Sequence, residues 1–530
     1  MVKGLFFFLF IFISIIPAVV IAQKTKPHVL SKLEIKKLKK EGSIKFAASD
    51  YKNALNSYLE LYKTDPQNID YIYRIGFCYL ETSIDKRAAM KYLEIANQSK
   101  VAKKEWIYFL GLAYMYNEKW DEAIKAFNTY KETSRSKLIK DFLNPVRMIE
   151  MCINGKELSS NPIHCRFTNL GKNINSPFEE YNPFISADEK SIVFTSRRKG
   201  NVGGYIEELG LYTADIYRSF WKDTTWGKSK NMGAGINSEW DEESVGYTAL
   251  GDMVFIYFET LDIFGDLGTS SLKGKMWQKF ELLFPQINSN VYEGGACISN
   301  DGATIFFSST RKEGRGGTDI WMIKKGKNGV WGNAVNLGNT INTIYDEDIP
   351  FLSLNGKRLY FSSKGWNSMG GFDIFYSDWS DSLKNWLEPV NIGFPINDAD
   401  DNKFISLTGD ERFAFVSAVR PEGYGDRDIY KVEFLDTLNH SFCQLITGSI
   451  TGLGGKIEIT KITLENRKTL ELSEHRPVTS TFQFIFAVKP GVYTLRAEGY
   501  NFLPYTEEIV IHNEYPPIEI KRNIKVKSSK

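Results

Sequence analysis

The sequence predicts a multidomain protein, with an α-helical solenoid first, a five-bladed β-propeller second and a small β-sandwich last. Three observations predict this order. Residues 32–155 have a helical pattern that repeats every 34 or 35 residues, and residues 163–434 repeat short strand-like runs with a period near fifty. Residues 444–526 then change to short runs that alternate apolar and polar residues. Repeats of about 34 residues are typical of helical arrays, and repeats of about 40 to 50 residues are typical of propeller blades.

The N-terminal segment predicts export. Lys3 precedes an apolar run from Leu5 to Ile21, and Val20-Ile21-Ala22 places small residues at the positions read by signal peptidase. We therefore expect residues 1–22 to be a secretory signal peptide that is cleaved before Gln23. An uncleaved anchor is the alternative, because the apolar run is nearly long enough to span a bilayer.

Composition limits the classes of partner. With 530 residues the chain has room for about two to four domains, and 42% hydrophobic residues are ample for their cores. The net charge is only +2, so nothing indicates binding to nucleic acid or to an anionic membrane surface. The five cysteines are scattered without a C-x-x-C motif, and they predict neither a disulfide framework nor a metal site. Cys165 and Cys443 flank the last blade, where they either pair or stay as buried free thiols.

Glycine, alanine and aromatic residues recur at fixed offsets in the helical segment. Gly42, Gly76 and Gly111 mark the repeat, and their followers are Ala54 and Tyr58, Ala88 and Tyr92, and Ala123 and Phe127. Small residues let paired helices approach closely, and aromatic rings fill the space between pairs. This pattern resembles tetratricopeptide repeats, which implies a concave face that binds a peptide or a partner protein. The alternative is a helical adaptor that only packs against the propeller.

An Ile-Asn pair recurs five times in the propeller segment, with spacings of 62, 51, 54 and 55 residues. The pairs are Ile174-Asn175, Ile236-Asn237, Ile287-Asn288, Ile341-Asn342 and Ile396-Asn397. After each pair come an acidic loop, a short strand, an aromatic strand, a third strand that typically starts Asp-Ile-aromatic, and a fourth that closes on Asn-x-Gly. Aromatic and β-branched runs bounded by Gly, Asn and Asp are typical of strands and turns. Four such strands make one blade.

The fifth unit stops at Phe434 without a fourth strand, whereas residues 167–171 match the fourth-strand pattern but precede the first unit. Pairing this segment with residues 428–434 closes the ring and removes two exposed sheet edges. The repeat resembles the PD40-type, WD40-like propellers of bacterial envelopes. Unit two departs from that pattern, because Gly268-Thr269-Ser270-Ser271 stands where Gly-x-Asp-Ile is expected.

The last segment carries Pro490-Gly491-Val492-Tyr493-Thr494-Leu495, followed by Gly499-Tyr500. It resembles the transthyretin-like fold of carboxypeptidase regulatory domains, in which Pro-Gly-x-Tyr-x-Leu forms a hairpin and a strand. The resemblance implies a β-sandwich over residues 444–526.

One acidic position recurs in the propeller, a few residues after each Ile-Asn pair. The residues are Glu180, Glu242, Glu293, Glu347 and, in a shorter loop, Asp400. They are expected to ring one face near the central channel, where they would bind a cation or a basic peptide. The structural alternative pairs each acid with the base that follows the second strand of its unit, and those bases are Arg197, Arg311, Lys364 and Arg420.

No catalytic constellation is recognised in the sequence. The five histidines are isolated, and neither H-E-x-x-H nor G-x-S-x-G occurs. We therefore expect no catalytic residue, no cofactor and no metal, and hence a protein that is not an enzyme.

The order of segments resembles that of periplasmic proteins associated with type IX secretion and gliding motility, in a family related to OmpA. The peptidoglycan-binding, OmpA-like domain of that family is not recognised here, so direct peptidoglycan binding is not expected. The resemblance implies a non-enzymatic periplasmic scaffold for secretion or outer-membrane assembly. Its helical repeats and propeller would bind protein partners, with an outer-membrane complex among them.

The competing class is a saccharide-binding or hydrolytic protein that uses the propeller channel, because a fold alone does not set function. The residues that line the channel distinguish the two classes of protein. A converging group of acids and bases would favour the saccharide class, and a channel walled by aliphatic and turn residues would favour the scaffold.

Overall fold

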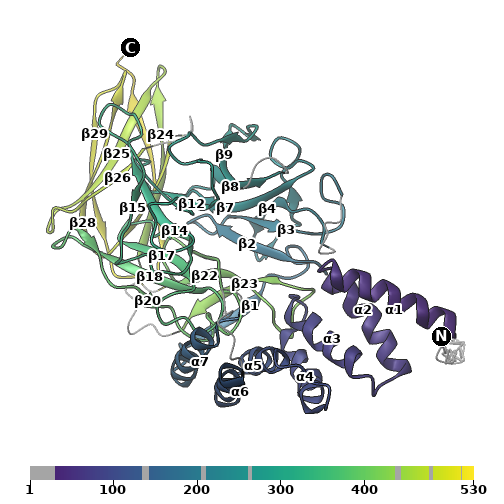
Figure 1. The fold of residues 1–530 in the computed structure, drawn as a ribbon. Helices are drawn as coiled ribbons and strands as arrows, with labels where there is room; N and C mark the ends of the chain where they lie inside the picture. The colour runs from purple at the N-terminus through teal and green to yellow at the C-terminus, as the bar shows by residue number, and fades with distance from the viewer. Residues whose placement is uncertain are drawn as a thin grey trace, which may run out of the picture.

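The computed structural model describes residues 30–133, 143–204, 211–260, 265–435, 443–476, 482–514 and 516–529. The predicted signal peptide, residues 1–22, lies outside these residues. Within them, no helix is both long enough and apolar enough to cross a membrane. A helical arm lies along one side of a β-propeller, and a β-sandwich covers another side (Figure 1).

The helical arm contains seven α-helices within the described residues. They are α1 (Lys32–Ala47), α2 (Tyr51–Thr64), α3 (Ile69–Leu80), α4 (Ala89–Gln98), α5 (Trp106–Tyr116), α6 (Trp120–Thr133) and α7 (Pro145–Ser160), with a 3-10 turn, η1 (Lys86–Ala88), before α4. Ser31 begins α1 with a capping box, in which its hydroxyl accepts from the Glu34 backbone N–H and the Glu34 carboxylate accepts from the Ser31 N–H.

The repeated glycines allow the helices to pair, as the sequence predicts. A Cβ atom added at Gly111 would lie 2.7 Å from the Phe127 ring, and one at Gly76 would lie 2.7 Å from Leu93. A Cβ at Gly42 would lie 3.1 Å from Ser57, with the Tyr58 ring next to it. The predicted contact between a glycine of one helix and the following helix is therefore confirmed, and larger residues at Gly76 or Gly111 would push the pairs apart.

In the described part of residues 165–434, the strands form five antiparallel sheets, which we call blades 1 to 5. Blade 1 holds β2 (Glu180–Ile185), β3 (Ser191–Ser196), β4 (Asp215–Lys222), β5 (Thr225–Trp226) and β6 (Lys230–Asn231). Blade 2 holds β7 (Asp241–Tyr247), β8 (Met253–Glu259), β9 (Asp266–Lys273), β10 (Met276–Trp277) and β11 (Glu281–Leu282). Blade 3 holds β12 (Glu293–Ile298), β13 (Thr304–Ser309), β14 (Asp319–Lys324) and β15 (Val335–Asn336).

Blade 4 holds β16 (Glu347–Leu352), β17 (Arg358–Ser363), β18 (Asp373–Ser380), β19 (Asn385–Trp386) and β20 (Val390–Asn391). Blade 5 holds β21 (Ile405–Leu407), β22 (Phe413–Ala418) and β23 (Asp428–Phe434), together with β1 (Cys165–Asn169) from before blade 1. β1 pairs with β23 in antiparallel register, from Cys165 opposite Phe434 to Asn169 opposite Tyr430. The predicted pairing of the first strand with the last blade is therefore confirmed.

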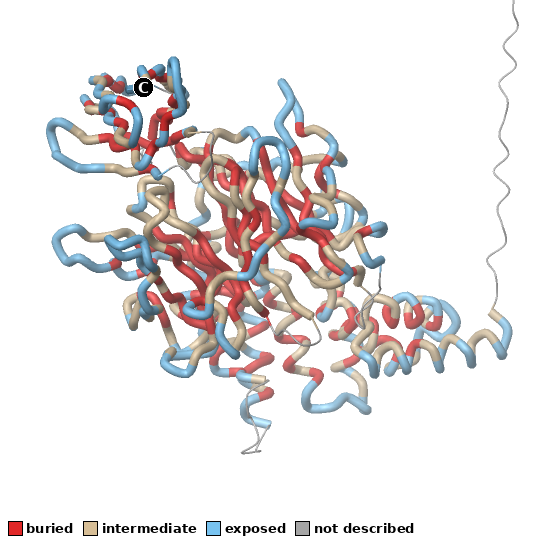
Figure 2. The backbone as a smooth tube through the Cα atoms, turned by 90° about the horizontal axis from the view of Figure 1, so that it is seen from above, coloured by how far each residue is buried: buried red, intermediate tan, exposed pale blue. Residues whose placement is uncertain are grey.

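Neighbouring blades pack against one another through their innermost strands. β2 contacts β7, β7 contacts β12, and β12 contacts β16, while β2 also contacts β21 and β22 of blade 5. Blades 4 and 5 share one buried cluster that includes Tyr360, Ile374, Ile405 and Val416. Figure 2 shows the buried backbone concentrated in these sheets. The ring is therefore closed by packing as well as by β1, and the predicted β-propeller fold of this segment is confirmed.

The repeated motif residues form one hydrogen-bonded chain within each motif-bearing blade. In blade 3, the Asn342 side chain accepts from the Ile320 N–H at 2.8 Å and donates to the Ile320 carbonyl at 3.0 Å. Asn342 also donates to Asn336, which in turn donates to the Asp319 carboxylate at 2.7 Å. The Ile-Asn, Asn-x-Gly and Asp-Ile-aromatic motifs thus repeat because together they fasten the third strand of a blade to its outer strand and loop.

In blade 4 the Asp of this hydrogen-bonded chain is Asp373, and its burial predicts that stability depends on pH. Asp373 is fully buried, its Oδ2 accepts from the Met369 N–H and from Asn391, and its Oδ1 has no partner. Burial raises the pKa of Asp373 to about 8. Because this folded-state pKa lies above the unfolded value, the stability that Asp373 contributes is present at low pH and is lost as pH rises through about 8.

We expect Asp373→Asn to keep the two accepted hydrogen bonds and to remove the cost of a buried charge. Its melting temperature should exceed that of the wild type at about pH 9, and the difference should shrink at about pH 5. Asp373→Ala, which removes the acceptor, should melt lower than the wild type at both pH values. Thermal unfolding at the two pH values checks this, and an Asn variant that is less stable only at high pH would contradict it.

The C-terminal sandwich consists of two facing sheets. One contains β27 (Gln483–Val488), β24 (Gln444–Leu453) and β30 (Glu519–Lys527), with β24 and β30 parallel. The other contains β26 (Leu472–His475), β25 (Glu458–Asn466), β28 (Gly491–Tyr500) and β29 (Tyr505–Ile511). A buried cluster that includes Ile446, Leu464, Phe484 and Leu495 lies between the sheets.

The predicted hairpin at Pro490-Gly491 is wrong. β27 ends just before this turn and β28 begins at it, but the two strands belong to different sheets. The turn is therefore a corner between the two layers. The buried Tyr493 side chain stabilises it, because its hydroxyl donates to the Lys489 carbonyl at 2.9 Å.

The arm and the sandwich dock on opposite ends of the propeller strands. Arg147 of α7 reaches the carbonyl of Lys364, which directly follows a second strand, whereas Asn300, in the turn between a first and a second strand, donates to the Ile485 carbonyl of the sandwich at 3.0 Å. The first and second strands of a blade are antiparallel neighbours, so these two positions lie at opposite ends of the blade. The helices therefore border the end of the channel at which the innermost strands begin.

Candidate functional site

The repeated acids predicted from the sequence lie inside the blades. Glu180, Glu242, Glu293 and Glu347 are each 0% exposed. Glu347 accepts hydrogen bonds from the N–H and the hydroxyl of Thr343, both at 2.7 Å, and from the Ser363 hydroxyl at 2.7 Å. Burial raises the pKa of Glu242 and of Glu347 to about 7. These carboxyl groups fasten the loop after each Ile-Asn pair to its blade.

The predicted pairing of acids with bases holds in blade 3, where Arg311 lies 3.4 Å from Glu293. Glu180 pairs at 3.0 Å with Arg198, the neighbour of the predicted Arg197. The other predicted bases pair elsewhere, Arg197 with Asp241, Lys364 with Asp346 and Arg420 with Glu422. Asp400 pairs at 2.5 Å with Lys86 of the helical arm, so it lies at the docking surface of the arm. Of the four predicted acid–base pairs, only that of Glu293 with Arg311 is therefore formed.

One cavity at the channel is lined by the residues that follow three of these acids, Glu243, Gly294 and Asp348. Because successive side chains of a strand point to opposite faces, a shift of one residue turns a side chain from the blade to the channel. The strand pairing is irregular just after each position, between Ser244 and Gly246 and after Asp348, and such bulges change the direction of a side chain.

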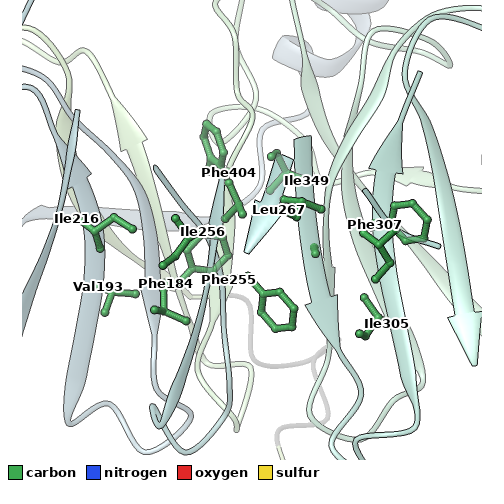
Figure 3. Packing of buried hydrophobic residues seen from close by; sticks show 14 of the residues in the cluster. Phe184, Val193, Ile216, Phe255, Ile256, Leu267, Ile305, Phe307, Ile349 and Phe404 are labelled. Atoms are coloured by element: carbon green, nitrogen blue, oxygen red, sulfur yellow. The ribbon is translucent and has the colours of Figure 1, made fainter. Parts of the chain in front are cut away.

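We call this cavity the channel cup. Its volume is about 240 Å³, and its charged residues are Asp241, Glu243, Glu259, Asp348, Arg197 and Lys403. Its apolar wall consists of Val245, Ile349 and Phe404, which belong to the main propeller core. Figure 3 shows Ile349 and Phe404 among the packed side chains between the sheets. The channel is therefore filled by core residues beside a polar cup.

One half of the cup is organised around Glu243. Arg197 lies 3.6 Å from Glu243 and 3.3 Å from Asp241, and it donates to the Tyr181 hydroxyl at 3.2 Å. The Tyr181 hydroxyl donates to Glu243 at 2.7 Å, and the Asn182 amide donates to its other oxygen at 3.2 Å. Burial raises the pKa of Glu243, and the charge of Arg197 opposes this rise. Glu243 is therefore a carboxyl group suited to holding a proton.

The other half of the cup is organised around Asp348. One of its oxygens accepts from the Ser308 hydroxyl at 2.6 Å and from the Ile349 N–H at 2.9 Å, and the other faces the Lys403 ammonium at 3.4 Å. The charge of Asp348 is the largest cause that raises the pKa of Tyr292, which lies beside it. Asp348 is therefore a fixed carboxylate, held by three donors and adjacent to a tyrosine hydroxyl.

Asn182 provides an observation that points to a ligand. Its side chain is 0% exposed, it lines the cup, and its Oδ1 has no hydrogen-bond partner. An unsatisfied buried acceptor costs about 1–3 kcal/mol, and such groups are rare in native structures. The backbone of Asn182 has φ +50°, a left-handed conformation that non-glycine residues seldom adopt. The positive φ accompanies the irregular pairing of β2 with β3 between Tyr181 and Phe184, and Ile349 has the same feature in β16. The unpaired oxygen is explained if a ligand in the cup donates a hydrogen bond to Asn182.

Within the described residues no group of three or more His, Cys, Asp or Glu side chains could hold a metal ion. Cys165 and Cys443, for which a pairing was open, are both free thiols. Apart from Arg197, the charged residues of the cup were not predicted from the sequence. The sequence feature that could have identified the site is variation at one position of the repeat. The residue after the repeated acid is Tyr181, Glu243, Gly294 or Asp348 in turn.

Neither the protein-family models nor the curated proteins give a match to this chain. Among solved structures, the chain is similar to TolB from Acinetobacter baumannii, with 12% identity, a TM-score of 0.31, and coverage of 48% of this chain and 55% of TolB. It is also similar to Penicillium chrysogenum α-L-arabinanase complexed with arabinobiose, with 11% identity, a TM-score of 0.31, and coverage of 52% and 99%. A third structure, a glycoside hydrolase, has 10% identity, a TM-score of 0.35, and coverage of 53% and 94%.

Two of these three structures are glycoside-cleaving enzymes, which contradicts the expectation that the chain is not an enzyme. That expectation rested on the absence of familiar sequence motifs, and the channel cup contains carboxyl groups that belong to no such motif. We therefore withdraw it. Similarities of 10–12% identity do not themselves assign an activity to this chain.

Proposed function

We propose that the channel cup binds a saccharide and hydrolyses a glycosidic bond in it. The observation that carries this proposal is the convergence of four carboxyl groups, a lysine and an arginine on one cavity, with the unsatisfied Asn182 oxygen in its wall. A converging group of acids and bases is the feature that separates a saccharide-using propeller from one walled by aliphatic and turn residues. Sugars offer hydroxyl donors of the kind that this wall requires.

The chemistry requires one carboxyl group that gives a proton to the leaving oxygen and another that acts as a base or nucleophile. Glu243 fits the first role, because burial raises its pKa. Asp348 fits the second, because Ser308, the Ile349 N–H and Lys403 hold it in place. Tyr257 and Tyr292, whose ring centroids are 5.8 Å apart, supply apolar faces on which a sugar ring can pack.

Glu243→Gln should keep the hydrogen bonds of Glu243 and lose its proton, so hydrolysis should fall about 100- to 10,000-fold. The measurement is release of reducing ends from a panel of pentose and hexose oligosaccharides, with binding followed by calorimetry. Glu281→Gln, on the exposed strand β11, is the matched control and should leave the rate unchanged. Absence of both binding and hydrolysis across the panel would contradict the proposal, and binding without hydrolysis would reduce it to a saccharide receptor.

We also propose, from the resemblance of sequence motifs, that the arm contains tetratricopeptide-type repeats and that the ring is a five-bladed propeller of the PD40 type. The same resemblance supports export to the periplasm and protein partners for the arm, including an outer-membrane complex. The support consists of the helix pairing at the repeated glycines and the five sheets of the ring. Mass spectrometry of the mature N-terminus tests the export, and a chain that keeps Met1 would contradict it.

A further inference from the structure

The charges in the channel cup do not balance. Four carboxyl groups face two cations, and even with Glu243 protonated three carboxylates remain. Both cations already have partners, since Arg197 lies beside Asp241 and Lys403 lies beside Asp348. A cavity with excess negative charge favours a positively charged ligand.

Among the described residues, Glu259 is the acid of the cup that forms no ion pair. Its carboxylate accepts a hydrogen bond from the Tyr257 hydroxyl at 2.5 Å, which is a neutral partner. The pKa of Tyr257 is raised by burial, and further by the charges of Glu259, Glu243 and Asp241, so these acids lie around one side of the cup. The Tyr257 and Tyr292 rings flank this side, and aromatic faces attract cations.

The unsatisfied atom in the wall of the cup is an amide oxygen, which can only accept a hydrogen bond. Asn182 Oδ1 needs a donor, and its own amide nitrogen is already used on Glu243. An ammonium group supplies three donors and a positive charge, whereas a hydroxyl supplies one donor and no charge. A uronate would place a further negative charge among the acids, which is costly.

We infer that the saccharide of the channel cup is an amino sugar with a free ammonium group, such as an oligosaccharide of deacetylated hexosamine. This inference rests on the proposed saccharide site and names its substrate class. The ammonium group lies among Asn182, Glu259 and the two tyrosine rings, while Glu243 and Asp348 face the glycosidic bond.

The test compares four probes by calorimetry on the full chain: a glucosamine tetrasaccharide, its N-acetylated counterpart, a galacturonic acid tetrasaccharide and a lysine tetrapeptide. The glucosamine probe should bind at least about tenfold tighter than the N-acetylated one, which is the factor that one favourable ion pair of about 1.4 kcal/mol supplies. The advantage should shrink as salt is added, because charge interactions at an open site are screened. The galacturonic acid probe should bind weakest.

Two substitutions should move the preference in opposite directions. Glu259→Gln should lower affinity for the glucosamine probe about tenfold and leave the N-acetylated probe unchanged. Lys403→Gln, which removes a positive charge, should increase the preference for the glucosamine probe. Glu281→Gln is the exposed control and should change neither affinity, and melting temperatures confirm that each variant folds.

Each outcome decides the inference. Equal affinity for the glucosamine and N-acetylated probes would overturn it and leave the proposed saccharide site standing. Tighter binding of the lysine peptide than of any saccharide would overturn it in favour of a basic peptide. Failure of all three saccharides to bind would instead contradict the proposed function itself.

Discussion

Deletion of residues 163–171 is expected to destabilise the whole propeller and not only the sheet that contains β1. β1 is the outermost strand of blade 5, and its five residues pair with β23 from Cys165 to Asn169. The pairing joins the start of the propeller segment to its end. Its loss would leave β23 as an unpaired edge, with backbone groups that no other strand satisfies.

Contacts around β1 extend this effect beyond one strand. Asn169 donates to the buried Asp428 at 2.8 Å and accepts from Asn175, so it completes the motif chain that blade 5 otherwise lacks. Ile163 donates from its backbone to the Phe394 carbonyl at 2.8 Å, which ties blade 4 to the same segment. The deletion therefore breaks contacts in blades 4 and 5 at once, and unfolding should become broad and begin at lower temperature.

Urea and thermal unfolding followed by circular dichroism measure this effect. Phe167 is half-buried, with the Arg420 guanidinium 4.0 Å from its ring, so Phe167→Ala should cost about 1–3 kcal/mol, less than a fully buried phenylalanine. Thr168→Ala, on the exposed face of the same strand, is the matched control and should change stability little. A deleted protein that melts cooperatively at the parent temperature would refute the argument.

The propeller could be predicted because its determinants are local and repeated. Asn342 binds Ile320, 22 residues earlier in the chain, and similar spacing recurs along the chain, so the pattern shows the strands and their order. β1 could be placed because Asn169 and Gly171 repeat the Asn-x-Gly signature away from their expected position. The hairpin at Pro490 could not, because the same turn residues serve a hairpin or a corner between sheets, and only the packing of Tyr493 decides.

The site could be predicted only to within one residue. Glu347 and Asp348 are adjacent acids, and the choice of which one faces the channel depends on strand register and on the irregularity after Asp348. Glu259 and Lys403 come from a second strand and from a loop, so nothing in their spacing associates them with Glu243. Their convergence arises only when the blades close into a ring.

The docking of the helical arm could not be predicted from the sequence either. In the structure it depends chiefly on Arg147. Arg147, in the first turn of α7, is 8% exposed. One nitrogen of its guanidinium donates to the carbonyls of Lys364 at 2.6 Å and Gly365 at 3.0 Å, and to the Ser368 hydroxyl at 2.9 Å. The guanidinium also lies 4.6 Å from the centre of the Tyr345 ring. A loop of blade 4 thus surrounds a cation that belongs to the arm.

Arg147→Ala should therefore release the arm from the propeller while each part stays folded. The substitution leaves the carbonyls of the loop buried without their donor, and each buried acceptor that is left unsatisfied costs about 1–3 kcal/mol. Two ion pairs would remain at the docking surface, Lys86 with Asp400 and Lys52 with Asp426, both at 2.5 Å. The side chains of these pairs are 12–29% exposed, and without the Arg147 contacts we expect them to hold the arm only loosely.

Small-angle X-ray scattering and hydrogen exchange measure the release. The variant should have a larger radius of gyration than the wild type, and amides around Lys364 and Ser368 should exchange faster while those of α5 and α6 keep their protection. Arg147→Lys should fall between the two, because an ammonium cannot reproduce the planar set of donors. Lys156→Ala, on the exposed face of the same helix, should behave as the wild type. If Arg147→Ala left the scattering curve and the exchange of this loop unchanged, the arm would be held by the apolar contacts of α6 and α7 with Met369 and Ala399, and not by the buried cation.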